Sequence, residues 1–198
     1  VASRATTTGL PIGNAFTATF SGSVNYTASA MDIDGSYYLL NTTGPTIDRY
    51  TYNYGSSAYT MASQFTVGAW AANVKAMAID QGTTGISLLD GTVKMIYTYA
   101  DRKTTGTPTP TSINLATALA PAPGTPTGLA INGRTGDYLI MDSTTAGTTI
   151  TDTGGPYNFK RLYLLNSSGL IQKRIFEIRT NDTSLVTGGQ YTTSNINA

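Results

Sequence analysis

The stretch YLLNTTGPTIDRY at residues 38–50 aligns without a gap with YLLNSSGLIQKRI at residues 163–175. In both copies an apolar run leads into Asn, two hydroxyl residues and Gly, and the following run carries an arginine at the same place. Asn tolerates left-handed backbone angles and caps turns with its side chain, and Gly adopts positive φ without steric cost. The two copies therefore predict two β-hairpins with related turns.

A second, weaker series marks the strands that precede such hairpins. The pattern of a small residue, an apolar residue, any residue, Ile and then Asp or Asn occurs three times, at 30–34, 76–80 and 128–132. The isoleucines are 46 and 52 residues apart. A second apolar run ending in Asn or Asp follows each one within a few residues. The pattern predicts a repeated unit of about 50 residues with three or four short strands.

The composition supports an all-β chain. Of 198 residues 36 are threonine and 13 are tyrosine, which favour strands, whereas Glu177 is the single glutamate and charged residues make up 12%. We expect an N-terminal arm with the first strands at 1–27, a repeat-built domain at 28–186 with units near 28–73, 74–125 and 126–186, and a C-terminal tail at 187–198. The arms are expected to order on a neighbouring subunit.

Repeats of 40–50 residues with four strands are the sequence signature of β-propeller blades. The copy at 128–132, followed by the run at 138–142, resembles the blades of the six-bladed NHL-like group of propellers. The resemblance implies a scaffold with a binding face, in a group that holds both enzymes and interaction modules. Because closed propellers typically have 4–8 blades, we expect a propeller-like array of three to four four-stranded units, with a β-sandwich or barrel as the alternative.

Two proline- and threonine-rich runs, at 104–111 and 121–126, predict extended loops, because proline donates no hydrogen bond and fits poorly in a central strand. The segment between them, 112–120, is expected to form a strand. Residues 143–156 are rich in Thr and Gly and are expected to form a long loop.

The residue types exclude most catalytic chemistry. The chain has no cysteine and no histidine, which rules out Cys/His zinc sites, a Ser-His-Asp triad and a thiol nucleophile. No catalytic residue is identified, and the chain is not expected to be an enzyme. A net charge of +1 argues against nucleic acid as a partner. The absence of any run of 18 apolar residues argues against a membrane span.

Two groups of residues are candidates for ligand binding. Asp32 and Asp34 resemble the start of a calcium loop but lack the later oxygen ligands, so a structural turn is the favoured interpretation, no metal site is predicted, and calcium is the one cofactor considered. Trp70, with the nearby Tyr50, Tyr52, Tyr54 and Tyr59, provides the aromatic faces that a sugar-stacking platform needs. The alternative for Trp70 is a buried core residue.

Four sequons, Asn followed by any residue and then Ser or Thr, are candidates for glycosylation. They begin at Asn25, Asn41, Asn166 and Asn181. Two of them, Asn41 and Asn166, occupy the same turn of the repeated hairpin, where we expect exposure.

These observations favour a non-enzymatic structural protein, extracellular, secreted, or on a virion or cell surface, that assembles into a homo-oligomer or polymer through its β domain and terminal arms. Its low charge removes the repulsion that keeps monomers apart. The chain starts at Val1 without an initiator Met, so we expect a processed, exported protein, with a piece of a longer protein as the alternative. The alternative function is a glycan-binding propeller lectin or adhesin domain, and a propeller-fold enzyme is third.

Overall fold

The computed structural model describes residues 24–56, 58–146, 159–179 and 196–197. In these ranges thirteen strands form three antiparallel sheets, so the prediction of an all-β chain built from sheets of about four strands is confirmed. The chain divides into two compact units, one formed by Val1–Ala72 with Lys103–Pro108 and the other by Asn73–Arg102 with Thr109–Ala198. The predicted arms at 1–27 and 187–198 lie mostly outside the described residues.

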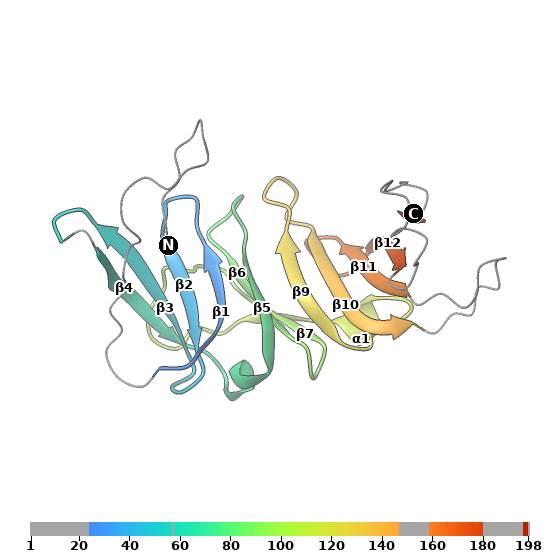
Figure 1. Ribbon diagram of the computed structural model, residues 1–198, viewed down its shortest axis with the longest axis horizontal. Helices are drawn as coiled ribbons and strands as arrows, with labels where there is room; N and C mark the ends of the chain where they lie inside the picture. Colours follow the sequence, from blue (N-terminus) through green and yellow to red (C-terminus); the bar gives the residue numbers. More distant parts are fainter. Residues whose placement is uncertain (1–23, 57, 147–158, 180–195, 198) are drawn as a thin grey trace, which may run out of the picture. The chain divides into compact units, whose positions relative to one another are not determined.

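The first unit contains one four-stranded sheet whose strands follow chain order (Figure 1). These strands are β1 (Tyr26–Met31), β2 (Tyr37–Asn41), β3 (Thr46–Asn53) and β4 (Ala58–Thr66). Alternate residues of β2 are buried, as expected of a strand with one covered face, and Tyr38 and Leu40 are fully buried there. Because the sheet is a meander, the β1–β2 turn and the β3–β4 turn lie at the same end of it.

The second unit contains two sheets, which follow chain order along the described strands. One sheet consists of β5 (Val74–Ile79), β6 (Ile86–Asp90), β7 (Met95–Tyr99) and β8 (Thr111–Asn114). The other consists of β9 (Pro126–Ile131), β10 (Tyr138–Ala146), β11 (Phe159–Leu165), β12 (Gln172–Arg179) and the short β13 (Ile196–Asn197). Each sheet pairs antiparallel throughout.

A shared hydrophobic core joins the two sheets of the second unit. Leu89 and Ile96 from one sheet pack with Ile140, Tyr163 and Leu165 from the other, and all five are fully buried. The first strands of the two sheets, β5 and β9, lie side by side (Figure 1). Neighbouring sheets packed in this way are consistent with the propeller-like arrangement that the repeat predicts and with a sandwich.

The turn after the first strand of each sheet closes in the same way. The amide of Asp32 donates to the Ser36 carbonyl at 2.9 Å, and the amide of Asp80 donates to that of Gly85 at 3.1 Å. The third turn closes with the amide of Asn132 at 2.9 Å from the Asp137 carbonyl oxygen. These three hydrogen bonds identify Asp32, Asp80 and Asn132 as the equivalent positions of the repeat.

This equivalence corrects the predicted alignment of the first unit. The sequence pattern matched Ile33 to Ile79 and Ile131, whereas the hydrogen bonds match Met31 to them. Ile33 lies beyond the end of β1, in the turn, and is 81% exposed. A two-residue shift leaves the alternation of a strand unchanged, so the pattern could not distinguish the two alignments.

The two copies of the gapless motif are both hairpins, but they are not equivalent parts of the repeat. The first joins β2 to β3, and the second joins β11 to β12, one strand later within its sheet. Their resemblance therefore lies in the turn residues, since in both turns the Asn side chain accepts from nearby amides, although the amides differ. The Asn41 Oδ1 accepts a hydrogen bond from the Thr43 amide at 3.0 Å, and the Asn166 Oδ1 accepts from the amides of Leu170 and Ile171 at 3.0 Å.

Two predictions about the connectors are wrong in part. Residues 112–120 do not form one strand, because β8 ends at Asn114, whose Oδ1 accepts from the Ala116 amide at 2.9 Å and caps the short helix α1 (Leu115–Ala118). Residues 143–146, expected to open a long loop, instead belong to β10, which continues to Ala146. Residues 147–158 lie outside the described ranges.

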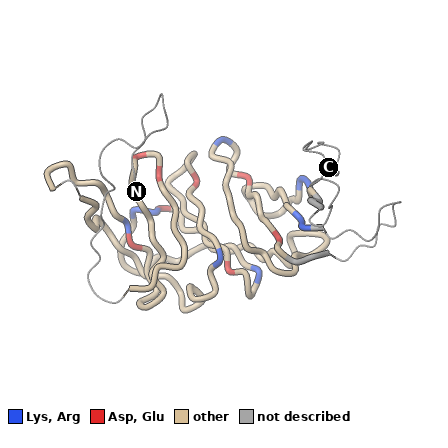
Figure 2. The backbone as a smooth tube through the Cα atoms, viewed as in Figure 1, with Lys and Arg blue, Asp and Glu red and all other residues tan. Residues whose placement is uncertain are grey.

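Charged side chains are sparse in both units, and Figure 2 shows long stretches of the tube without any. Across the described ranges, no helix is long and apolar enough to span a membrane.

Candidate functional site

Four tyrosines of the first unit gather beside the β1–β2 and β3–β4 turns. The Tyr52 ring, on β3, lies edge-on to the Tyr54 ring with 4.9 Å between centroids and to the Tyr59 ring with 5.4 Å. The Tyr37 ring, on β2, lies edge-on to Tyr59 at 5.1 Å. Edge-to-face contacts at these separations are favourable, which holds the cluster together.

The cluster borders a surface hollow of about 260 Å³, which we call the tyrosine hollow. Its lining consists of Asp34, Gly35, Tyr52, Tyr54 and Tyr59. Tyr52 and Tyr59 are half-buried, whereas Tyr54 is 87% exposed. The hollow therefore combines two anchored rings with one ring that is open to a ligand.

Local turn chemistry positions these residues. The Asn53 Oδ1 accepts from the Gly55 amide at 2.9 Å, a side-chain turn that leaves Tyr54 projecting at the tip of the β3–β4 connection. On the opposite wall Gly35 has a φ of 81°, a conformation that favours glycine. The Gly35 carbonyl accepts a hydrogen bond from the Tyr59 hydroxyl at 3.4 Å, which links the two turns across the hollow.

Asp34 supplies the one carboxylate among the residues that line the tyrosine hollow. Its Oδ1 accepts from the Ser36 amide at 2.8 Å, and its Oδ2 lies 3.6 Å from the Arg49 Nη2 and 3.5 Å from the Lys103 Nζ. Partial burial raises the pKa of Asp34, but the hydrogen bonds from Ser36 and the Lys103 charge outweigh it and bring the pKa below its ordinary value. The carboxylate thus stays ionised at neutral pH.

Tyr59 stays neutral at neutral pH and above. Burial, together with the neighbouring rings of Tyr37, Tyr52 and Tyr54, raises the pKa of its hydroxyl. The hollow thus presents aromatic surface, the neutral phenol of Tyr59, an ionised carboxylate and two nearby cations. This set of groups can contact C–H surfaces and exchange hydrogen bonds with hydroxyl groups.

The structure brings together three of the five predicted aromatic residues. Tyr52, Tyr54 and Tyr59 line the hollow. Tyr50 is instead 4% exposed in the core, with its hydroxyl 3.0 Å from that of Tyr26. Trp70 lies in the short 3-10 helix η1 (Ala69–Asn73), half-buried over Gly68, and is not among the lining residues. The Asp34–Gly35 turn completes the site.

The two calcium candidates, Asp32 and Asp34, form hydrogen bonds within the β1–β2 turn. The Oδ1 of buried Asp32 accepts from the Ile33 amide at 2.7 Å, while Asp34 faces Arg49 and Lys103. Within the described ranges no group of three or more acidic side chains could hold a metal ion.

The sequons differ in accessibility. Asn25 is exposed, whereas Asn41 is 8% exposed and the half-buried Asn166 uses its Oδ1 to close a turn. This burial corrects the expectation that Asn41 lies exposed in its turn. Asn181 lies outside the described residues.

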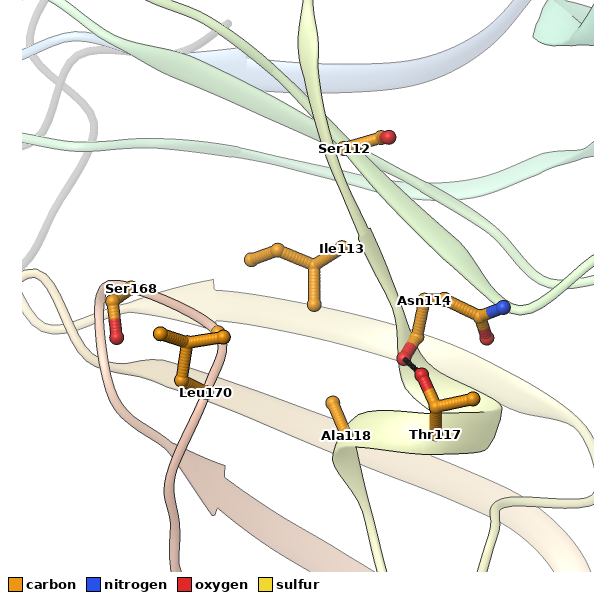
Figure 3. A pocket seen from close by; sticks show the side chains of 8 residues that line it. Ser112, Ile113, Asn114, Thr117, Ala118, Ser168 and Leu170 are labelled. Atoms are coloured by element: carbon orange, nitrogen blue, oxygen red, sulfur yellow. Dashed lines mark hydrogen bonds between the residues drawn. The ribbon is translucent and has the colours of Figure 1, made fainter.

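A second hollow, of about 250 Å³, lies in the second unit between β8, α1 and the β11–β12 turn. Figure 3 shows Ile113 central to it, with Leu170 and Ser168 from the turn on one side and Thr117 of α1 donating to the Asn114 carbonyl on the other. A Cβ on Gly169 would collide with Ile113, so the turn rests directly on β8. With no charged lining residue, this hollow is best described as a packing seam.

Comparison with known proteins identifies no family. No family model matches the chain, and no curated protein sequence matches it. The NHL-like resemblance is therefore not confirmed.

Among solved structures, one similar chain is in the crystal structure of a nidogen/laminin complex, with 12% identity and a TM-score of 0.46. The matched region covers 78% of this chain and 56% of the nidogen/laminin chain. Another is in Kuenenia stuttgartiensis hydrazine synthase, with 11% identity, a TM-score of 0.46, and coverage of 79% and 36%. This chain spans about half of the first and about a third of the second, and neither likeness assigns it a ligand or an activity.

Proposed function

We propose that this chain is a non-enzymatic binding module that holds carbohydrate in the tyrosine hollow. The observation that carries the proposal is the exposed Tyr54 ring, supported edge-on by Tyr52 above a turn that holds an ionised carboxylate. Aromatic rings pack against the C–H faces of sugars, and carboxylates accept hydrogen bonds from their hydroxyls. A secreted or surface location, where glycans are available, belongs to the same proposal.

The same geometry favours binding over hydrolysis. Glycosidases generally use a pair of carboxyl groups, one of them protonated as the acid. Asp34 is the single carboxylate of the hollow, and its lowered pKa makes it a poor proton donor. These features support a lectin-like role.

A glycan array tests the proposal directly. We expect the wild-type chain to bind a subset of glycans, and Tyr54→Ala to lose that binding, because the open aromatic face is removed. Tyr54→Phe keeps the ring and is the matched control, which should retain most of the signal. An array without any bound glycan, or one on which Tyr54→Ala binds like the wild type, would contradict the proposal.

Binding should be nearly independent of pH between roughly 5 and 9, where ordinary Asp and Tyr side chains do not titrate. Asp34 has a lowered pKa, so its carboxylate remains ionised at the lower limit of this pH range. Tyr59 has a raised pKa, so its hydroxyl remains neutral at the upper limit. Titration calorimetry of one array-selected glycan across this range provides the measurement. A drop in affinity of tenfold within it would show that a different titratable group controls binding.

Assembly with further copies of the chain is a second candidate function, favoured by strand β4. Its nine residues contain neither a charged residue nor proline, and it forms an edge of the first sheet. Near its C-terminal end, Phe65 forms a bridge with Gly106 on the outer side of the strand. Long uncharged edge strands readily pair with other strands. A monodisperse monomer in sedimentation at high protein concentration would exclude this function.

A further inference from the structure

A third hollow lies between the two sheets of the second unit and encloses about 320 Å³. Its walls come from the β5–β6 turn and from β6, β7, β9 and β10. The residues that matter for its chemistry are Asp80, Ser87, Thr98, Ile131 and Tyr138. We call it the hydroxyl cavity.

Three hydroxyl groups form a continuous row in this cavity. The Ser87 Oγ lies 2.7 Å from the Thr98 Oγ1, across the β6–β7 pair, and the Thr98 Oγ1 lies 3.2 Å from the Tyr138 hydroxyl of the other sheet. Ser87 is fully buried and Tyr138 is 6% exposed. Because each hydroxyl offers one donor and two acceptor sites, the row retains a donor and several lone pairs for a ligand.

The carboxylate of Asp80 also lines the hydroxyl cavity, and two hydrogen bonds hold it in place. The Asp80 Oδ1 accepts from the Gly82 amide and its Oδ2 accepts from the Thr83 hydroxyl, both at 2.9 Å. A Cβ on Gly82 would collide with the Gly133 carbonyl, so the two turns at the rim touch. A shallower hollow of about 260 Å³ shares Asp80 and Thr83 and continues outward past Arg134.

We infer that the hydroxyl cavity binds a small, uncharged polyhydroxylated molecule of monosaccharide size. The hydroxyl row and Asp80 would exchange hydrogen bonds with ligand hydroxyls, and Ile131 provides apolar surface for C–H groups. The volume corresponds to about ten water molecules, enough for a ligand with about that many non-hydrogen atoms. The single charged side chain among the lining residues is acidic, which disfavours an anionic ligand.

This site is independent of the tyrosine hollow, and the test separates the two. The probes are glycerol, myo-inositol, D-glucose, D-galactose and D-mannose, titrated into the full chain by ligand-observed NMR and calorimetry. Thr98→Val removes the central hydroxyl while keeping the shape, and we expect it to weaken binding about tenfold. Thr92→Val, at an exposed threonine of the β6–β7 turn, is the matched control and should bind like the wild type.

Two further variants keep the inference testable. Tyr138→Phe removes only the terminal hydroxyl of the row and should also weaken binding, so it replaces Thr98→Val if that variant fails to fold. Tyr54→Ala should leave this binding unchanged, even if the tyrosine hollow binds no glycan. The inference is overturned if no probe binds, if Thr98→Val and Tyr138→Phe both bind like the wild type, or if binding depends on Tyr54.

Discussion

Ile140→Ala should lower the free energy of unfolding by about 2–5 kcal/mol, the usual cost of emptying a buried aliphatic site. Ile140 is fully buried on the interior strand β10, where it pairs with Leu129 and Tyr163. Its side chain belongs to the core that the two sheets of the second unit share, so the loss weakens both sheets. Urea unfolding followed by circular dichroism and tyrosine fluorescence provides the measurement.

Met141→Ala is the matched control for this prediction. Met141 is the next residue on the same strand, faces the opposite side and is 39% exposed, so its truncation should cost about 1 kcal/mol or less. Equal losses for the two variants would mean that the shared core does not hold the two sheets together.

Tyr52→Ala should weaken glycan binding about 30-fold, equivalent to about 2 kcal/mol for an aromatic residue at the centre of a binding surface. The Tyr52 ring lies between those of Tyr54 and Tyr59, and its removal would take away contact surface and the support of Tyr54 together. The measurement is calorimetric titration of an array-selected glycan.

Tyr52→Phe keeps the ring and should bind within a few-fold of the wild type. The unfolding free energy of both variants is measured alongside, which separates lost contacts from a lost fold. A Tyr52→Ala variant that is folded and binds with wild-type affinity would contradict the role assigned to this ring.

The sequence predicted the strands well, because strand formation depends on local alternation and on turn residues. Asn41 and Asn166 do close turns with their side chains. Alternation has a period of two residues, however, and therefore could not reveal that Met31, and not Ile33, is equivalent to Ile79. The helix α1 was missed because its cap, Asn114, lies within a run that also reads as a strand.

The candidate site could be predicted only in part. Tyr52, Tyr54 and Tyr59 were identified because they are close in sequence. Tyr50 was included for the same reason, although its position in the middle of β3 buries it. Asp34 was noted only as a calcium candidate. It lies 18 residues before Tyr52, and the antiparallel order of the sheet is what brings their turns to the same end.

The most direct test of carbohydrate binding is an NMR titration of the isotope-labelled chain with the glycan that binds best on the array. We expect the largest chemical-shift changes at the aromatic signals of Tyr52, Tyr54 and Tyr59 and at the amides of Asp34 and Gly35. Saturable shifts that instead centre on Trp70, with these five residues unchanged, would contradict the assignment of the tyrosine hollow as the binding site.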